Sequence, residues 1–264
     1  MSPDLYFALT LVVKMAVTAG FVLAATMTAE RAGPLVGGLV ATLPIGAGPV
    51  YVFLALDHDA HFIAQSAVAS LAINAVNVMF ATVYVLLAQK RSLLVSLSLG
   101  LLAWTALALF VHWVPWTVSG ALALNGVVLG VSLWLVRPLR RVTMPPVRTR
   151  WYDLAIRAVL VALLVGVTVG LSFRIGPAGS GILAVFPVVL ISIMLILHPR
   201  VGGKPTAAVL ANAALGLVGF AIACAVLRFT AEPLGIPIGL ALALGTSIGW
   251  SMAVLIARRH GVAV

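Results

Sequence analysis

Apolar residues fill long stretches of this 264-residue chain, and polar residues gather in the short segments between them. A helix needs about 20 consecutive apolar residues to cross the hydrocarbon core of a membrane. Counted on that basis, the pattern predicts nine membrane spans. They cover residues 5–27, 34–56, 60–88, 92–112, 116–136, 153–173, 178–198, 205–228 and 234–257. The expected fold class is an all-α polytopic membrane protein.

Composition agrees with this class, since 63% of the residues are hydrophobic and 8% are charged. A soluble globular domain has about 25% charged residues, so that class is excluded. The net charge of +10 would suit nucleic-acid binding only if the cations shared a soluble face with aromatic residues. They lie between apolar spans instead, so no nucleic-acid partner is expected. A single cysteine, Cys224, excludes an intrachain disulfide.

The cations between the spans predict the orientation, because Lys and Arg collect on the cytoplasmic side of membrane proteins. Two arginines, Arg174 and Arg228, fall on the opposite side with Asp4, Asp57, Asp59 and Glu232. Twelve cations fall on one side: Arg31, Lys90, Arg91, Arg137, Arg140, Arg141, Arg148, Arg150, Arg200, Lys204, Arg258 and Arg259. We therefore expect the amino terminus outside and the carboxyl terminus in the cytoplasm.

The chain contains an internal repeat. Residues 31–44 match residues 174–187 at a shift of 143, with six of fourteen positions identical. The identical positions include the pairs Gly33-Pro34 and Gly176-Pro177, and Pro44 with Pro187. Lys14 falls on Arg157 at the same shift, and the sequence around Asn74 resembles that around Asn212 at a shift of 138. Self-similarity of this kind indicates a duplicated structural unit.

The repeats are expected to have opposite orientations, because they begin with the first and the sixth span. An odd offset of five spans reverses the direction in which a helix crosses the membrane. Pairing the fourth span with the ninth, near Gly100 and Gly245 at a shift of 145, preserves this inversion. The predicted organisation is a four-helix repeat over 1–113, a linking helix with a basic loop over 114–150, and an inverted four-helix repeat over 151–264.

Two features of the second half resemble a known family. Residues 181–187, Gly-Ile-Leu-Ala-Val-Phe-Pro, follow a basic residue, and a helix ending in Leu227-Arg-Phe precedes a Gly- and Ala-rich span containing Trp250. Residues 153–257, and more loosely 10–112, thus resemble the GlpM family of small bacterial inner-membrane proteins. The resemblance implies a unit of about four spans and a bacterial inner-membrane location, and the fused second unit departs from it. It implies no established activity.

Helix breakers mark the second and seventh spans. Pro44 and Pro187 each lie about ten residues inside a span, where proline removes a backbone donor. Inverted-repeat transporters place their substrates beside such broken helices near the midplane. Hinges are therefore expected at six positions: Gly33, Pro34, Pro44, Gly176, Pro177 and Pro187. The alternative is that these prolines only bend packed helices.

Cations supply the candidate binding residues. Lys14 lies about 14 Å inside its span, and a charge at that depth normally marks a partner or a pathway. Arg157 is close enough to the membrane surface for its side chain to reach the headgroups. Arg31 and Arg174 adjoin Gly-Pro helix starts, where anions are favoured, although lipid anchoring would explain them equally well. No acidic residue lies deep in a predicted span, so an anionic substrate is expected to supply the missing countercharge.

Asparagines inside the spans are further candidates. Asn74 and Asn212 could donate hydrogen bonds to a substrate, whereas interhelical packing is the alternative role. The segment 57–61, Asp-His-Asp-Ala-His, has metal-ligating residue types but comes from one loop, so no metal is expected. The segment 198–206 lacks the first glycine and the Ser/Thr of a phosphate loop. No acid-base pair is visible, so no cofactor and no enzyme activity are expected.

The leading hypothesis is a transporter or flippase-like carrier for an anionic organic or phosphate-bearing substrate. The residues expected to bind it are Lys14, Arg31, Arg157, Arg174, Asn74 and Asn212. The alternative is a non-transporting scaffold subunit of an envelope lipid or polysaccharide complex that docks through residues 137–150. Expected partners are the lipid bilayer, a small anionic substrate or lipid phosphate, and either a second copy of the chain or an envelope-complex protein.

Overall fold

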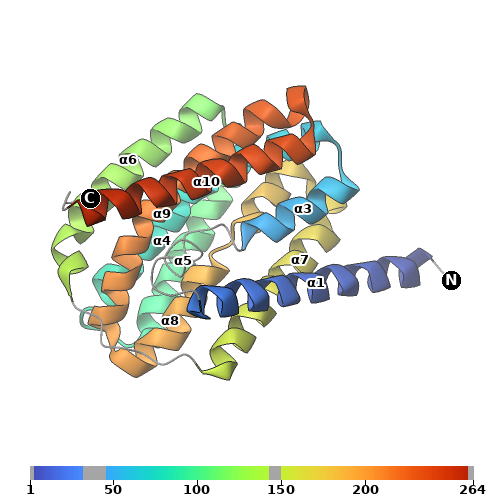
Figure 1. Cartoon of the computed structure of the whole chain (residues 1–264). Coiled ribbons are helices and arrows are strands. Elements are labelled where there is room, and N and C mark those ends of the chain that lie inside the picture. Colours follow the sequence, from blue (N-terminus) through green and yellow to red (C-terminus); the bar gives the residue numbers. More distant parts are fainter. Residues whose placement is uncertain (1–2, 32–45, 143–149, 261–264) are drawn as a thin grey trace.

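The computed structural model describes the whole chain except residues 1–2, 32–45, 143–149 and 261–264. The described residues form helices joined by short turns (Figure 1). The α-helices are α1 (Pro3–Arg31), α3 (Ala47–Asp57), α4 (Ala60–Leu87), α5 (Leu93–Trp113), α6 (Val118–Val136), α7 (Trp151–Ala184), α8 (Val188–Val201), α9 (Gly203–Leu234) and α10 (Ile236–Arg259). A 3₁₀ helix, η1 (Arg137–Arg141), follows α6.

Seven helical stretches in the described part of the chain are long and apolar enough to cross a membrane. The protein is thus a multi-pass helical membrane protein, as its hydrophobicity predicts. Helix α3 has 11 residues, which is too short for a complete span. Because residues 34–45 of the predicted second span lie outside the described part, the count of nine stays a prediction.

The longest stretch, residues 151–201, turns back on itself at Gly176. Its first half ends beside the start of α4, where Ser172 contacts His58. Its second half then follows α4 in the parallel direction, since Gly181 contacts Ser70 and Val185 contacts Asn77. Gly176 has φ 66° and ψ −174°, a conformation open to glycine and strained for other residues. The predicted sixth and seventh spans are therefore separated by a glycine turn.

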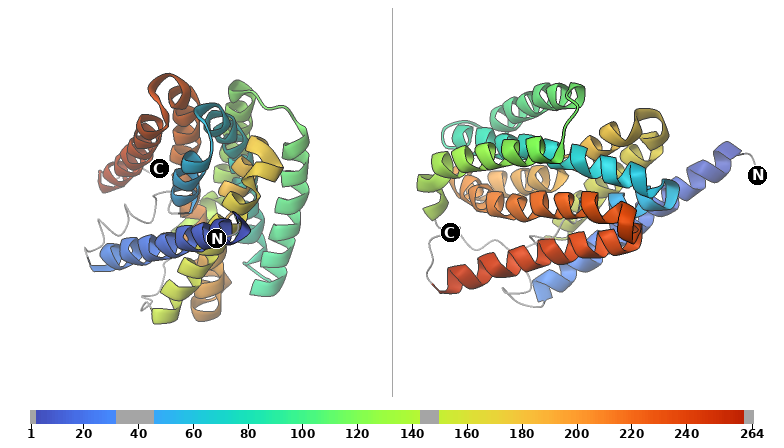
Figure 2. Two further views of the ribbon diagram at one scale, coloured as in Figure 1. Left: turned by 90° about the vertical axis from the view of Figure 1, so that its right-hand side faces the viewer. Right: turned by 90° about the horizontal axis from the view of Figure 1, so that it is seen from above.

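Helices α4 and α9 lie side by side and antiparallel at the centre of the molecule (Figure 2). Three contacts set this direction: His61 with Glu232, Asn74 with Leu217, and the close approach of Gly203 to Ala88. Helices α1 and α7 also run antiparallel, with Met15 against Gly166 and Leu11 against Gly170. The apolar core is formed largely by α4 together with the inner faces of its neighbours.

Two pairs of helices begin at the same spacing along the chain. Helix α4 begins at Ala60 and α9 at Gly203, and α5 begins at Leu93 and α10 at Ile236, which are 143 residues apart in both cases. The position equivalent to Asn74 at this spacing is Leu217. The shifts of 138 and 145 that the sequence suggested for the later helices therefore differ from the spacing of the helices themselves.

Candidate functional site

Two short helices begin at the centre of the bundle and run in opposite directions. Helix α3 ends at Asp57, beside the carboxyl-terminal part of the first half of α7, where Ser172 lies. Helix α8 ends at Val201, and its Arg200 contacts Asp153 at the start of α7. We call the end of the molecule where α3 stops the acidic end, because Asp57, Asp59 and Glu232 lie there. We call the opposite end, where α8 stops, the basic end, because Arg91, Arg150 and Arg200 lie there.

The starts of α3 and α8 lie close together. A side-chain carbon at Gly46, which precedes α3, would lie 3.5 Å from Val189 Cγ2 and 3.6 Å from Val188 Cγ2. Gly46 and Val189 are themselves 143 residues apart. Neither helix has a side-chain cap at its start, where Gly46 and Pro187 are the flanking residues. Helix starts carry unpaired N–H groups and partial positive charge, so this region favours an anion.

A cavity of about 510 Å³ adjoins the start of α3. It is bordered by α1, α3, α9 and α10, and its lining includes Thr18, Gly48, Tyr51, Phe220 and Cys224. Most of the other lining residues are aliphatic or aromatic. A ligand in this cavity would therefore contact apolar walls, with its polar part at the helix start.

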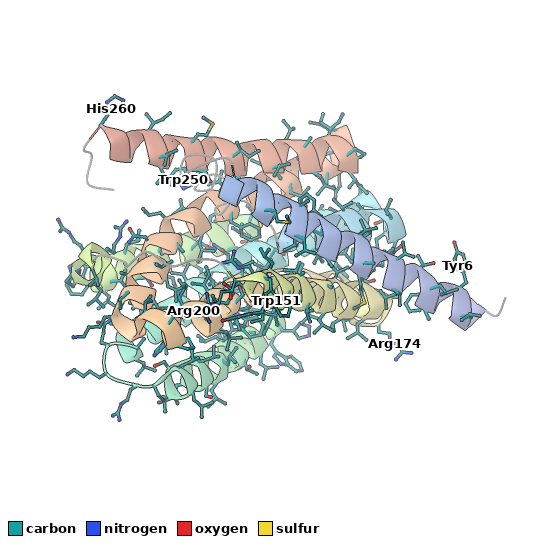
Figure 3. The ribbon with its side chains drawn as sticks, turned by 60° about the horizontal axis from the view of Figure 1, so that its bottom comes forward. Tyr6, Trp151, Arg174, Arg200, Trp250 and His260 are labelled. Carbon is teal, nitrogen blue, oxygen red and sulfur yellow. The ribbon has the colours of Figure 1, made fainter. Side chains whose placement is uncertain are left out.

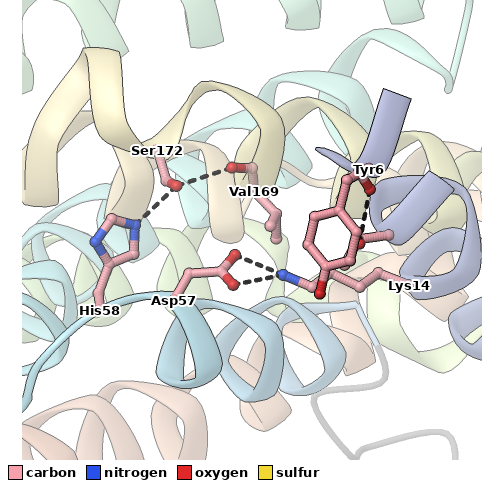
Figure 4. A network of polar contacts seen from close by, with 7 residues as sticks. Tyr6, Lys14, Asp57, His58, Val169 and Ser172 are labelled. Carbon is pink, nitrogen blue, oxygen red and sulfur yellow. Dashed lines mark hydrogen bonds and ion pairs between the residues drawn. The ribbon is translucent and has the colours of Figure 1, made fainter. Parts of the chain in front are cut away.

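Lys14 forms an ion pair with Asp57 beside this cavity (Figure 4). Lys14 Nζ lies 2.6 Å from Asp57 Oδ1 and 2.5 Å from Oδ2, and 5.9 Å from the centre of the Phe53 ring. Lys14 is 8% exposed. This pair corrects the expectation that the countercharge must come from a substrate. In the sequence, Asp57 directly follows the second predicted span. In the structure, it is the last residue of α3 and lies against α1, the helix that holds Lys14.

A second ion pair lies at the basic end, between Asp153 of α7 and Arg200 of α8. Arg200 Nη1 donates to Asp153 Oδ2 at 2.7 Å, and Nη2 donates to the other carboxylate oxygen. The guanidinium also lies over the ring of Tyr152, 5.1 Å from its centre. Figure 3 shows Arg200 close to the start of α7, where Trp151 is labelled. Sequence reasoning missed this pair because Arg200 looked like one of many topology signals.

The two pairs share one equivalent position, at which the charge is reversed. Asp57 and Arg200 are 143 residues apart, whereas the position equivalent to Asp153 is Thr10 and the position equivalent to Lys14 is Arg157. The first half joins its long helix to its short helix through Lys14 and Asp57. The second half joins α7 to α8 through Asp153 and Arg200. The short helix thus ends in a carboxylate at the acidic end and in a guanidinium at the basic end.

The other predicted cations do not gather at one site. Arg157 lies one helical turn after Asp153 at the basic end of α7. Arg174 is exposed at the acidic end of α7, two residues before the turn at Gly176. Arg31 ends α1, and its side chain lies outside the described atoms. Lys14, Arg157 and Arg174 are therefore in three separate places.

The predicted asparagines bind helices to one another. Asn74 Nδ2 donates to Asn125 Oδ1 at 2.8 Å and to the Leu217 carbonyl oxygen at 3.0 Å. Asn125 in turn donates to carbonyl oxygens of α4 and α6. Asn212 donates to Ala208 in its own helix and to the carbonyl oxygen of Arg140. These contacts favour the packing role. Asn125 was missed, although a lone asparagine in an apolar span was the available signal.

Asn77 holds the break between α7 and α8. Helix α7 ends at Ala184 and α8 begins at Val188, so the interruption lies at Val185–Pro187. Asn77 Nδ2 donates to the Val185 carbonyl oxygen at 2.7 Å and Oδ1 accepts from Trp104 Nε1 at 2.7 Å. The side-chain amide thus supplies a donor to a carbonyl oxygen inside the interruption.

The loop at the acidic end uses its polar residues for structure. His58 Nε2 contacts Ser172 Oγ at 2.8 Å (Figure 4). The His58 ring also stacks on the ring of Phe62. Burial lowers the pKa of His58 below its usual 6.5, against the opposing effect of Asp57 and Asp59. Asp59 accepts a hydrogen bond from the Phe62 amide. No group of three or more His, Cys, Asp or Glu within the described residues is placed to hold a metal ion.

Three expected hinge residues, Gly33, Pro34 and Pro44, lie outside the described residues. Gly176, Pro177 and Pro187 lie at the turn and the interruption described above, and their role as hinges stays a prediction. Comparison of the chain with protein-family models, curated proteins and solved structures found no match.

Proposed function

We propose that this protein is a membrane transporter or flippase-like carrier that moves an anionic organic or phosphate-bearing substrate by alternating access. The observation that carries the proposal is the close approach of the starts of α3 and α8. Two short helices that start close together inside a bundle can offer N–H groups to an anion without exposing them to lipid. Neither helix start has a side-chain cap, although the Val188 N–H is bonded to the carbonyl oxygen of Phe186.

Internal symmetry supports the same proposal. Helices that would be equivalent in two inverted repeats are antiparallel neighbours: α1 with α7, and α4 with α9. Asn74 contacts Leu217, and Gly46 contacts Val189, at the spacing of 143 residues. Contacts between equivalent positions are expected where a two-fold axis passes through the molecule. Such an axis, lying in the membrane plane, relates the halves of many carriers.

Each ion pair holds two helices together at one end of the molecule and so closes that end. Lys14–Asp57 holds α1 against the end of α3, and Asp153–Arg200 holds α7 against the end of α8. In alternating access, one end opens while the other stays closed. We assign Lys14 and Asp57 to the closure at the acidic end, and Asp153 and Arg200 to the closure at the basic end. Lys14 therefore controls whether the site is open at the acidic end.

A charge placed at the central site tests the proposal. A side chain at Gly48, in the first turn of α3, would meet no atom within 4 Å, so substitutions fit there. Purified protein in vesicles would be screened with radiolabelled organic anions and with fluorescent lipid phosphates. For a transported compound, Gly48→Asp should lower the initial rate at least about tenfold, because a carboxylate repels an anion at a helix start. Gly48→Asn, which is similar in size and neutral, should retain most of the rate.

Three results would overturn the proposal. One is that none of the anions or lipid phosphates crosses faster than in empty vesicles. Another is that Gly48→Asp and Gly48→Asn transport equally well. A third is a stable envelope-complex partner, lost when residues 137–150 are neutralised, together with flat uptake, which would identify the scaffold subunit.

A further inference from the structure

A groove separate from the central site lies between α5 and α7 at the acidic end. Its volume is about 470 Å³. The apolar part of its wall comes from Trp104, Ala108, Leu109, Ile182 and Leu183. Two basic side chains, His112 and Arg174, also line it. Along α5, the groove extends from Trp104 to His112, a rise of about 12 Å at 1.5 Å per residue.

Arg174 makes no hydrogen bond or ion pair within the described residues. Asp57 is bound to Lys14, Glu232 contacts Arg228 and His61, and Asp59 accepts from a backbone amide. Asp4, at the start of α1, has a side chain outside the described atoms. Figure 3 shows Arg174 at the edge of the bundle, with its guanidinium pointing away from the helices. The cation is therefore available to an anion from outside the protein.

The mouth of the groove lies at the level expected for lipid headgroups. Trp113, which follows His112, is 83% exposed at the end of α5. Exposed tryptophans at helix ends mark the interface between hydrocarbon and headgroups. From that level, the apolar wall continues toward the middle of the bundle. The groove thus offers positive charge to a headgroup and an apolar channel to an acyl chain.

We infer that this groove binds one anionic phospholipid from the leaflet at the acidic end. Its phosphate lies on Arg174, with His112 beside it, and one acyl chain lies along Trp104 and Leu183. A guanidinium suits a phosphate because it offers several donors in one plane. The groove floor is fixed, because Trp104 donates to Asn77 at 2.7 Å. Binding at this site is an equilibrium property and does not depend on transport.

Native mass spectrometry of the detergent-purified protein tests the inference. Phosphatidylglycerol and phosphatidylcholine with identical acyl chains would be titrated separately. Wild-type protein should bind the anionic lipid more tightly, and Arg174→Gln should weaken that binding about tenfold with little effect on phosphatidylcholine. Arg174→Lys should retain part of the affinity. Arg228→Gln is the matched control, since Arg228 lies at the same end and is paired with Glu232.

The apolar part is tested with a second pair of variants. Thr105 lines the groove and Leu102 does not, although both belong to α5 and are exposed to lipid. Thr105→Trp should fill the channel and weaken binding of phosphatidylglycerol, whereas Leu102→Trp should leave it unchanged. Inorganic phosphate at millimolar concentration should not compete. The inference is wrong if Arg174→Gln binds as well as wild type, if the two tryptophan variants behave alike, or if free phosphate displaces the lipid.

Discussion

Asn74 donates a hydrogen bond to the carbonyl oxygen of Leu217, the residue that follows it by 143 positions. The contact joins α4 to α9, whose first residues are separated by the same number. Asn74 is fully buried, and Asn125 of α6 occupies its second donor position. Helix α6 is therefore held at the contact between α4 and α9.

The Lys14–Asp57 pair should contribute to stability as a unit. Lys14→Gln or Asp57→Asn alone leaves a poorly solvated charge, and each should lower the free energy of unfolding by roughly 3 kcal/mol. The double variant should be less destabilised than the two single effects added together. Thermal unfolding in detergent measures all three. Additive effects would mean that the two side chains do not interact in solution.

Gly181 should tolerate no side chain. A Cβ there would lie 2.2 Å from the carbonyl oxygen of Ser66, so Gly181→Ala must push α7 away from α4. The expected loss is about 1–3 kcal/mol. Gly130 of α6 provides the control, because a Cβ at that position meets nothing within 4 Å. Gly130→Ala should leave stability unchanged or raise it by up to about 1 kcal/mol. Equal unfolding temperatures for the two variants would contradict the close packing.

Stability should fall in mild acid because of His58. Burial lowers the pKa of His58 in the folded protein, so the unfolded chain takes up a proton first as the pH falls through 6.5. Stability that is present at neutral pH is therefore lost below 6.5. Unfolding temperatures from pH 7.5 to 5.5 would show this slope. His58→Gln should flatten it, whereas His260→Gln, at an exposed position, should not. An unchanged slope in His58→Gln would assign the effect to other groups.

Asn77 should matter more to stability than Asn212. Asn77→Ala leaves the Val185 carbonyl oxygen and the Trp104 indole without their partners, at a cost of about 2 kcal/mol. The bond from Asn212 to another element, the carbonyl oxygen of Arg140, is longer at 3.3 Å, so Asn212→Ala should cost less than about 1 kcal/mol. Denaturation of both variants in the same detergent makes the comparison. The reverse order would show that the interruption at Val185–Pro187 does not need the amide.

The sequence predicts much of the helix pattern because span length follows directly from membrane thickness. It also places the turn at Gly176 and the interruption at Pro187, since both residues restrict the backbone in known ways. The tertiary partners are harder to predict. Asp57 is the last residue of α3 and pairs with Lys14 of α1, and nothing in the hydrophobic pattern shows which helix packs beside it.

Charge pairing caused the main error at the site. Asp57 and Asp153 lie at the ends of predicted spans, where carboxylates normally face water. The fold brings each of them against a cation from a helix that is distant in sequence. The repeat alone does not suggest this, because position 57 carries Asp while position 200 carries Arg. A depth estimate for Lys14 identified the unusual cation but not its partner.

The exchanged charges of the two pairs have an electrical consequence. If the basic end faces the cytoplasm, as the arginine distribution predicts, a potential that is negative inside pulls Arg200 inward and pushes Asp57 outward. Both short helices are then held at their own ends by the same field. The electrical free energy of one elementary charge changes by about 2.3 kcal/mol per 100 mV when it crosses the full membrane. Displacement of α3 or α8 toward the midplane would therefore work against the resting voltage of an energised cell and become easier in a depolarised one.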